Sequence, residues 1–154
     1  MCPRAVDMDL GLNGDVALVT AGSAGLGLAS ATALAAAGAD VAVCGRTPDQ
    51  LEVARKQLER QGDGNILALQ ADITDRTAVE HFVDETVTTF GGLDHVITSA
   101  GGPRSGPFLE MDDDDFYTAY DLLVMSVVWT TRAAYTHLVK GAGGSIVNIT
   151  SRSV

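Results

Sequence analysis

Short, unbroken runs of apolar residues alternate along the chain with longer stretches in which apolar residues recur at helical spacing. The runs have the length of buried strands, and strands are predicted at 16–20, 40–45, 65–71, 93–98 and 145–150. Leu51, Ala54 and Leu58 illustrate the helical spacing between two of these runs. Helices are accordingly predicted over 28–37, 47–61, 74–90 and 112–140.

The predicted strands are continuously apolar rather than alternating, which indicates a sheet buried on both faces. A repeated strand–helix order within one domain predicts a parallel sheet with helices on both sides. The fold class is therefore α/β, a Rossmann-type doubly wound sheet with five strands in the chain. In such a sheet the loops that follow the strands meet at one crevice, where ligands bind.

The loop after the first strand is rich in glycine and opens directly into an alanine-rich helical stretch. It reads Ala21-Gly-Ser-Ala-Gly-Leu-Gly27. A helix N-terminus presents unpaired N–H groups and the positive end of its dipole, and a loop without bulky side chains lets a diphosphate approach them. This strand–loop–helix context predicts dinucleotide binding.

The end of the second strand bears on which dinucleotide is bound. A carboxylate at that point binds the ribose hydroxyls of NAD and repels a 2′-phosphate. Here the position is Gly45, and Arg46 follows with a guanidinium that suits phosphate. The pattern favours NADP(H) over NAD(H). The alternative for Arg46 is a solvated loop cation.

The remaining strand ends carry small or polar residues that a ligand can approach. Asp72 follows the third strand, where its carboxylate accepts either from an exocyclic amine or within a turn. The small residues 99–102 follow the fourth strand and let a ring or a ribose lie against the backbone. Thr150 and Ser151 place hydroxyl groups at the end of the fifth strand. We expect all these strand ends to line one crevice.

Composition limits the alternatives. The chain has 154 residues and a net charge of −10, which argues against a nucleic-acid partner and is typical of a solvated acidic surface. Its two cysteines are too few for a disulfide framework or a zinc site. No apolar run reaches membrane-spanning length, and the start is not of signal-peptide type. A cytoplasmic location is therefore expected.

Two further segments favour structural interpretations over chemical ones. The acidic run from Asp112 to Asp115 is expected to cap a helix and complement its dipole rather than bind a metal. Residues 1–13 are expected to be a disordered lead-in, and residues 14–154 to form the domain.

Taken together, these positions resemble the short-chain dehydrogenase/reductase family, classical type, from Leu10 onward. The resemblance rests on the glycine loop, on Asp72-Ile73, on Ala100-Gly101 and on Gly144-Ser-Ile-Val-Asn-Ile-Thr-Ser151. The turn Gly101-Gly-Pro103 is similar to that of 3-oxoacyl-reductase-like and sugar-dehydrogenase-like members.

The resemblance implies a role for each matching residue. The pyrophosphate and its ribose would lie against Gly22, Ser23, Gly25, Leu26 and Gly27. Arg46 would bind the 2′-phosphate, Asp72 and Ile73 the adenine, and Ala100 and Gly101 the nicotinamide ribose. Ser151 falls on the catalytic serine, which hydrogen-bonds the oxygen of a small carbonyl or alcohol substrate.

Three substitutions depart from the family pattern. Ala21 replaces the first glycine of the loop, and Gly22 is expected to keep the turn open. Thr98-Ser99 replaces a pair of asparagines. Leu123 stands on the long helix where a relay asparagine is usual, and leucine cannot hold a water molecule.

The fourth departure concerns the Tyr-x-x-x-Lys pair, which members of the family carry on the helix after the catalytic serine and which these 154 residues do not contain. None of Tyr117, Tyr120 and Tyr135 has a lysine four residues on, and these tyrosines are expected to pack on the long helix. The C-terminal part of the domain is therefore expected to be missing, which would leave strand 145–150 as an exposed edge of the sheet.

These expectations combine into one leading hypothesis. The chain would be the cofactor-binding portion of an NADP(H)-dependent oxidoreductase, whose full-length parent moves hydride between nicotinamide and a carbonyl or alcohol carbon. The parent is expected to be a homo-oligomer, and turnover by the 154 residues alone is not expected. The alternative is a non-catalytic truncated remnant or a nucleotide-binding module. The substrate stays open.

Overall fold

The computed structural model describes residues 10–140 and 143–151. Within these residues five strands form one parallel sheet in the order β3-β2-β1-β4-β5. The strands are β1 (Val16–Val19), β2 (Asp40–Gly45), β3 (Ile66–Gln70), β4 (His95–Thr98) and β5 (Ser145–Asn148). The predicted fold class is confirmed, and so are all five predicted strands to within two residues at each end.

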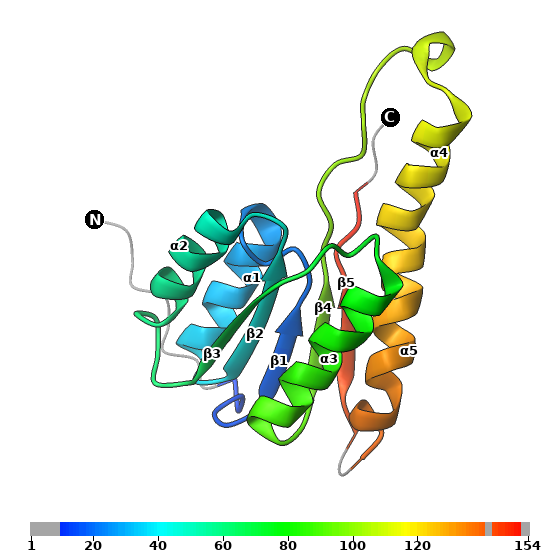
Figure 1. Cartoon of the computed structure of the whole chain (residues 1–154). Coiled ribbons are helices and arrows are strands. Elements are labelled where there is room, and N and C mark those ends of the chain that lie inside the picture. Colours follow the sequence, from blue (N-terminus) through cyan, green and yellow to red (C-terminus); the bar gives the residue numbers. More distant parts are fainter. Residues whose placement is uncertain (1–9, 141–142, 152–154) are drawn as a thin grey trace.

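Helices cover both faces of the sheet, as predicted. Figure 1 shows α1 and α2 on one face, with α3 and α5 on the other. Their bounds are α1 (Gly25–Ala36), α2 (Pro48–Leu58), α3 (Arg76–Phe90), α4 (Asp113–Tyr120) and α5 (Ser126–Leu138). A 3-10 turn, η1 (Phe108–Glu110), precedes α4, and a π-helical turn, η2 (Asp121–Met125), joins α4 to α5.

Alternate side chains of the same strands enter two separate apolar clusters. On β1, Leu18 packs into the cluster formed with α3 and α5, whereas Val19 packs into the one formed with α1 and α2. Phe82 of α3 is the largest fully buried side chain of the first cluster. Because both faces are covered, every residue of β1 is buried. This accounts for the unbroken apolar runs in the sequence.

Two helices carry side-chain or glycine caps at their ends. Asp75 accepts from the N–H groups of Thr77 and Ala78 at the start of α3, and Gly91 ends that helix with a φ of +85°. Asp112 accepts from the N–H of Asp115, whose side chain accepts in return from the N–H of Asp112. The acidic run is therefore a capping box, as predicted.

The long helix differs from the prediction in one respect. The hydroxyl of Ser126 donates to the carbonyl oxygen of Leu122 (2.6 Å), and the N–H of Ser126 donates five residues back to Asp121. This π-helical turn interrupts what was predicted as one regular helix, and Leu123 lies within it. The spacing of apolar residues in the sequence does not reveal where a helix gains one extra residue in a turn.

The expectation that the tyrosines pack on this helix is wrong. Tyr117, Tyr120 and Tyr135 are 69%, 54% and 60% exposed. Figure 1 shows α4 extending beyond the end of the sheet, so none of the described strands lies beneath its first turns. Helical spacing alone does not tell whether a neighbouring element is present to cover a face.

Strand β5 lies at one edge of the sheet, as expected, and all four of its residues are exposed. His95 ties this edge to the start of β1, because its ring nitrogens lie 2.9 Å from Asp15 Oδ2 and 2.8 Å from Ser145 Oγ. A carboxylate can only accept, so Nε2 donates to Asp15, and in the neutral ring Nδ1 accepts from the Ser145 hydroxyl.

The predicted lead-in falls partly outside the described residues, since residues 1–9 are not among them. Of the rest, Leu12 packs against the cluster of α1 and α2. The N–H of Gly14 donates to the carbonyl oxygen of Gly38 (3.1 Å). The packed part of the domain therefore includes Leu12.

Candidate cofactor site

The sheet order places a topological switch point between β1 and β4. The chain moves outward from β1 through β2 to β3 and then returns to the other side of β1 with β4. Ligands of doubly wound sheets bind beyond the carboxyl ends of the strands at this point. The glycine loop after β1 and the segment after β4 therefore flank the expected crevice.

The glycine loop is held tightly against β2. The N–H of Gly22 donates to the carbonyl oxygen of Cys44 (2.9 Å), and a Cβ added to Gly22 would lie 2.8 Å from Cβ of Val43. A Cβ on Gly27 would lie 2.5 Å from the carbonyl oxygen of Ala21. Both glycines are thus required by close approach of backbone and side chains.

Ala21 itself adopts the left-handed conformation, with a φ of +48°. Gly22, which was expected to keep the turn open, has no positive φ, and its lack of a side chain serves the contact with β2. A left-handed alanine is strained, because its Cβ approaches the following carbonyl group. The family glycine that Ala21 replaces would carry no such strain.

The N-terminus of α1 is suited to an anion. Its N-cap residue, Ala24, makes no side-chain capping hydrogen bond, and the first turn holds no acidic residue. Gly25 has a φ of +57°, and a Cβ there would meet nothing within 4 Å. Leu26 is exposed and Gly27 is buried. Uncapped N–H groups, the helix dipole and open space together fit a phosphate group.

The end of β2 lies directly beside this loop. Ser23 is the neighbour of Gly45, whose carbonyl oxygen accepts from the N–H of Ala71 (3.1 Å). The side chain of Gln70 donates to the carbonyl oxygen of Arg46 (2.9 Å), which fixes the backbone of that residue. Arg46 is exposed, and no ion pair engages its guanidinium within residues 10–140 and 143–151.

Asp72 and Ile73 follow β3 and adopt more structural positions. Oδ1 of Asp72 accepts from the N–H (2.9 Å) and the hydroxyl (2.8 Å) of Thr74, so that oxygen forms a turn. Ile73 is 6% exposed and packs in the core cluster of α3 and α5. The turn interpretation that the sequence left open for Asp72 accounts for Oδ1.

Thr20 and Ser99 join the ends of β1 and β4. The Thr20 hydroxyl donates to the carbonyl oxygen of Ser99 (2.7 Å) and accepts from its N–H (2.9 Å). Both residues are buried. This reciprocal pair joins the residue before the glycine loop to the residue before Ala100. Thr20 was not among the predicted site residues, and Ser99 was predicted only as one of the small residues after the fourth strand. A hydroxyl at the end of an apolar strand was nevertheless a signal for such a link.

Ser151 follows β5, and it is exposed. The segment that carries it is tied to β4 by two hydrogen bonds. The Thr98 hydroxyl donates to Oδ1 of Asn148 (2.7 Å), and the N–H of Ile149 donates to the carbonyl oxygen of Thr98 (2.9 Å). Because the sheet is parallel, all five predicted strand ends lie along its carboxyl-terminal side.

Cys44 lies beneath the loop but has no chemical part in the site. It is fully buried in the strand, and this burial raises the pKa of its thiol to about 12. Reactive cysteines are accessible and have a lowered pKa. Cys44 is accordingly a core residue, as its apolar surroundings in the sequence indicate.

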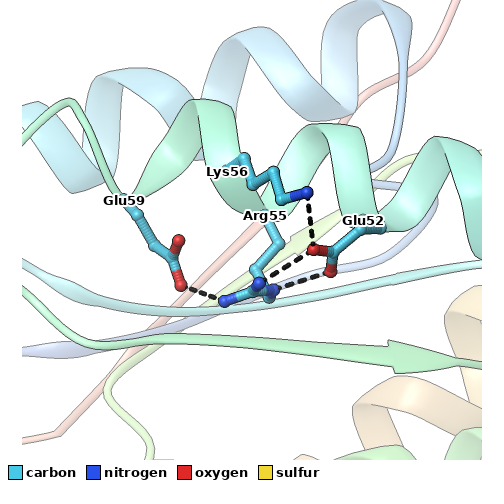
Figure 2. A network of polar contacts seen from close by, with 4 residues as sticks. All are labelled: Glu52, Arg55, Lys56 and Glu59. Carbon is cyan, nitrogen blue, oxygen red and sulfur yellow. Dashed lines mark hydrogen bonds and ion pairs between the residues drawn. The ribbon is translucent and has the colours of Figure 1, made fainter.

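A network of charged side chains lies elsewhere, on the exposed side of α2. Figure 2 shows Arg55 between Glu52 and Glu59, with Lys56 also reaching Glu52. The hydrogen bonds from Arg55 and Lys56 lower the pKa of Glu52 to about 2. Because these side chains are solvated, the network adds little stability. It borders a shallow hollow of about 380 Å³ on α2, away from the strand ends.

Comparison with known proteins decides the family. The sequence model described as short chain dehydrogenase matches residues 15–153. The chain belongs to the short-chain dehydrogenase family. Its similarity to an uncharacterized oxidoreductase of Staphylococcus aureus is 31% identity over 142 residues, covering 92% of this chain and 60% of that relative. The chain thus spans about 60% of the length of this relative.

Solved structures of other family members share the fold. A short chain dehydrogenase from Burkholderia cenocepacia, in complex with NADP, is 38% identical with a TM-score of 0.83, covering 89% of this chain and 55% of its own. L-sorbose reductase from Gluconobacter frateurii, complexed with NADPH and L-sorbose, is 30% identical with a TM-score of 0.87. That alignment covers 92% of this chain and 54% of the reductase.

Two general properties follow for this chain. The chain belongs to a family of oxidoreductases, and it has the Rossmann-like NAD(P)-binding fold. Among the residues that the structure describes, no helix has the length and apolar character to cross a membrane. Over the same residues, no three side chains of the metal-binding types gather in one place.

Proposed function

We propose that this chain is the NADP(H)-binding portion of an oxidoreductase that moves hydride between nicotinamide and a carbonyl or alcohol carbon. The observation that carries the proposal is the junction of the glycine loop with the end of β2. The bond from Gly22 to Cys44 holds this junction together, and Gly45 and Arg46 stand where an acidic residue would select NAD.

The residues present fit the cofactor at each of its charged parts. The uncapped start of α1 would hold the pyrophosphate against Gly22, Ser23, Gly25, Leu26 and Gly27. Arg46 would form charge-assisted hydrogen bonds with the 2′-phosphate. The two NADP-containing family structures support this choice, since each is at least 30% identical to the chain.

The remaining assignments extend the same crevice. Asp72 retains Oδ2 for an adenine amine while Oδ1 holds the turn, and Ile73 supports that loop from the core. Ala100 and Gly101 would contact the nicotinamide ribose, because the Thr20–Ser99 pair joins the residue before the glycine loop to the residue before Ala100. Ser151 would donate a hydrogen bond to the oxygen of the substrate. When bound, the cofactor supplies the hydride chemistry.

For the 154 residues by themselves we propose cofactor binding without turnover. No tyrosine of the chain has a lysine four residues on, so no Tyr-x-x-x-Lys pair is available to transfer the proton. A cytoplasmic location, a small carbonyl or alcohol substrate and a homo-oligomeric parent complete the proposal.

Titration of the purified chain with NADPH and NADH, followed by nicotinamide fluorescence, tests the proposal. NADPH is expected to bind more tightly, by about tenfold or more if the 2′-phosphate pairs with Arg46. Arg46→Ala should remove most of that difference and leave NADH binding unchanged. Absence of binding by either cofactor would refute the proposal, and tighter binding of NADH would refute the role of Arg46.

A further inference from the structure

We propose that Ser23 and Gly45 act as a steric pair that sets cofactor choice, because Ser23 fills the space that an acidic side chain at position 45 would need. This inference rests on the proposed function. It adds that the selection against NAD lies in a contact between two elements and not in Arg46 alone. A substitution at position 45 is therefore insufficient to reverse the preference.

The contact between these residues is close enough to exclude any side chain at position 45. A Cβ built on Gly45 would lie 2.6 Å from Oγ and 2.9 Å from Cβ of Ser23. Rotation of the Ser23 hydroxyl would move Oγ away, but Cβ of Ser23 is fixed to the backbone. Cβ atoms in well-packed proteins do not approach this closely. A larger residue at 45 must therefore displace the loop.

The loop has little room to move away. The N–H of Gly22 is bonded to the carbonyl oxygen of Cys44 (2.9 Å), and a Cβ on Gly22 would lie 2.8 Å from Cβ of Val43. On the other side, the same loop contacts Gly27, where a Cβ would lie 2.5 Å from the carbonyl oxygen of Ala21. Displacement of Ser23 would therefore disturb the segment proposed to hold the pyrophosphate.

Position 45 is also held in place by hydrogen bonds from the end of β3. The N–H of Ala71 donates to the carbonyl oxygen of Gly45 (3.1 Å), and the side chain of Gln70 donates to the carbonyl oxygen of Arg46 (2.9 Å). The end of β2 is thus held to β3 while the loop is held to β2. Neither partner can retreat without breaking hydrogen bonds, so the glycine at 45 and the serine at 23 depend on each other.

A binding cycle on the whole chain tests this dependence with four proteins: the wild type, Gly45→Asp, Ser23→Gly and the double variant. Gly45→Asp alone is expected to weaken NADPH without gaining NADH. Adding Ser23→Gly makes room for the carboxylate, and NADH affinity should then rise at least about tenfold above that of Gly45→Asp. Equal NADH affinity of the single and double variants would overturn the inference.

A second cycle separates the steric contact from charge and from cofactor. Gly45→Ala should lower the urea midpoint of unfolding, and Ser23→Gly in the same chain should restore most of the loss. Gly92→Ala is the matched control, because a Cβ at that glycine would meet nothing within 4 Å. A Gly45→Ala variant as stable as the Gly92→Ala control would overturn the inference.

The outcomes distinguish this inference from the proposed function. A wild type that binds neither cofactor would overturn the proposed function, and cofactor choice with it, even if the stability cycle still showed the contact. If the wild type prefers NADPH but the two substitutions change NADH affinity additively, this inference is overturned and the proposed function stands.

Discussion

Replacing Ala21 with glycine should stabilise the protein, although glycine normally destabilises. Ala21 has a φ of +48° in the loop that ends β1. The left-handed conformation costs a residue with a Cβ roughly 1–2 kcal/mol. Glycine removes that cost because it has no Cβ.

Two opposing effects reduce the gain from Ala21→Gly. Glycine makes the unfolded chain more flexible, which costs about 0.4–1 kcal/mol. Ala21 is also partly buried against the core cluster of α3 and α5, so part of one methyl contact is lost. The net expectation is a stabilisation of about 0.5 kcal/mol, or an increase in Tm of about 1–2 °C for a chain of this size.

The matched control is Ala33→Gly, which makes the same chemical change at an exposed position inside α1. There glycine should cost about 1 kcal/mol, as in any helix interior. The two variants should therefore differ by about 1.5 kcal/mol in the free energy of unfolding, measured by urea denaturation. If Ala21→Gly destabilises as much as Ala33→Gly, the left-handed strain at Ala21 is refuted.

Three further predictions concern the core, the sheet edge and a tight turn. Burial raises the pKa of Cys44 from 9.0 to about 12, so the unfolded chain loses the thiol proton first as the pH rises. The contribution of the protonated Cys44 thiol to the free energy of unfolding is complete below pH 9. Relative to Cys44→Ala, it falls by about 1 kcal/mol per pH unit between about pH 9 and 12. If urea denaturation gives the two proteins parallel pH profiles, this prediction is wrong. His95→Ala removes the link from Asp15 to Ser145 and should cost about 1–2 kcal/mol, with faster amide exchange in β5; unchanged exchange there would contradict the role of His95. Gly64→Ala should cost more than about 2 kcal/mol, because its Cβ would lie 2.1 Å from the carbonyl oxygen of Ala39; a variant within about 0.5 kcal/mol of wild type in urea denaturation would show that the turn can relax.

The sequence predicted those parts of the fold that depend on local pattern. The run Asp40–Gly45 is a strand with the predicted limits, because both faces of the sheet are buried and its apolar character is unbroken. The Asp112–Asp115 run caps its helix as expected, since capping depends on residues within one turn. The parallel order followed from the strand–helix alternation.

The features that were not predicted depend on contacts between distant segments. The Thr20–Ser99 pair joins residues 79 positions apart. The contact of Ser23 with Gly45 requires the distance between a loop and a neighbouring strand, which no spacing in the sequence gives. The exposure of Tyr117 and Tyr120 likewise depends on what lies beside α4. The positive φ of Ala21 could have been suspected from the glycine that the family has there, but Gly22 offered an equally simple alternative.

Amide hydrogen exchange of the whole chain with and without NADPH tests the central claim most directly, because it reports where the cofactor binds. We predict protection at 21–27, at Gly45-Arg46 and at 99–101, with no change on the exposed side of α2. Protection confined to the hollow at Val53, Lys56 and Arg60, or none anywhere at saturating NADPH, would contradict the assignment of the strand ends as the cofactor site.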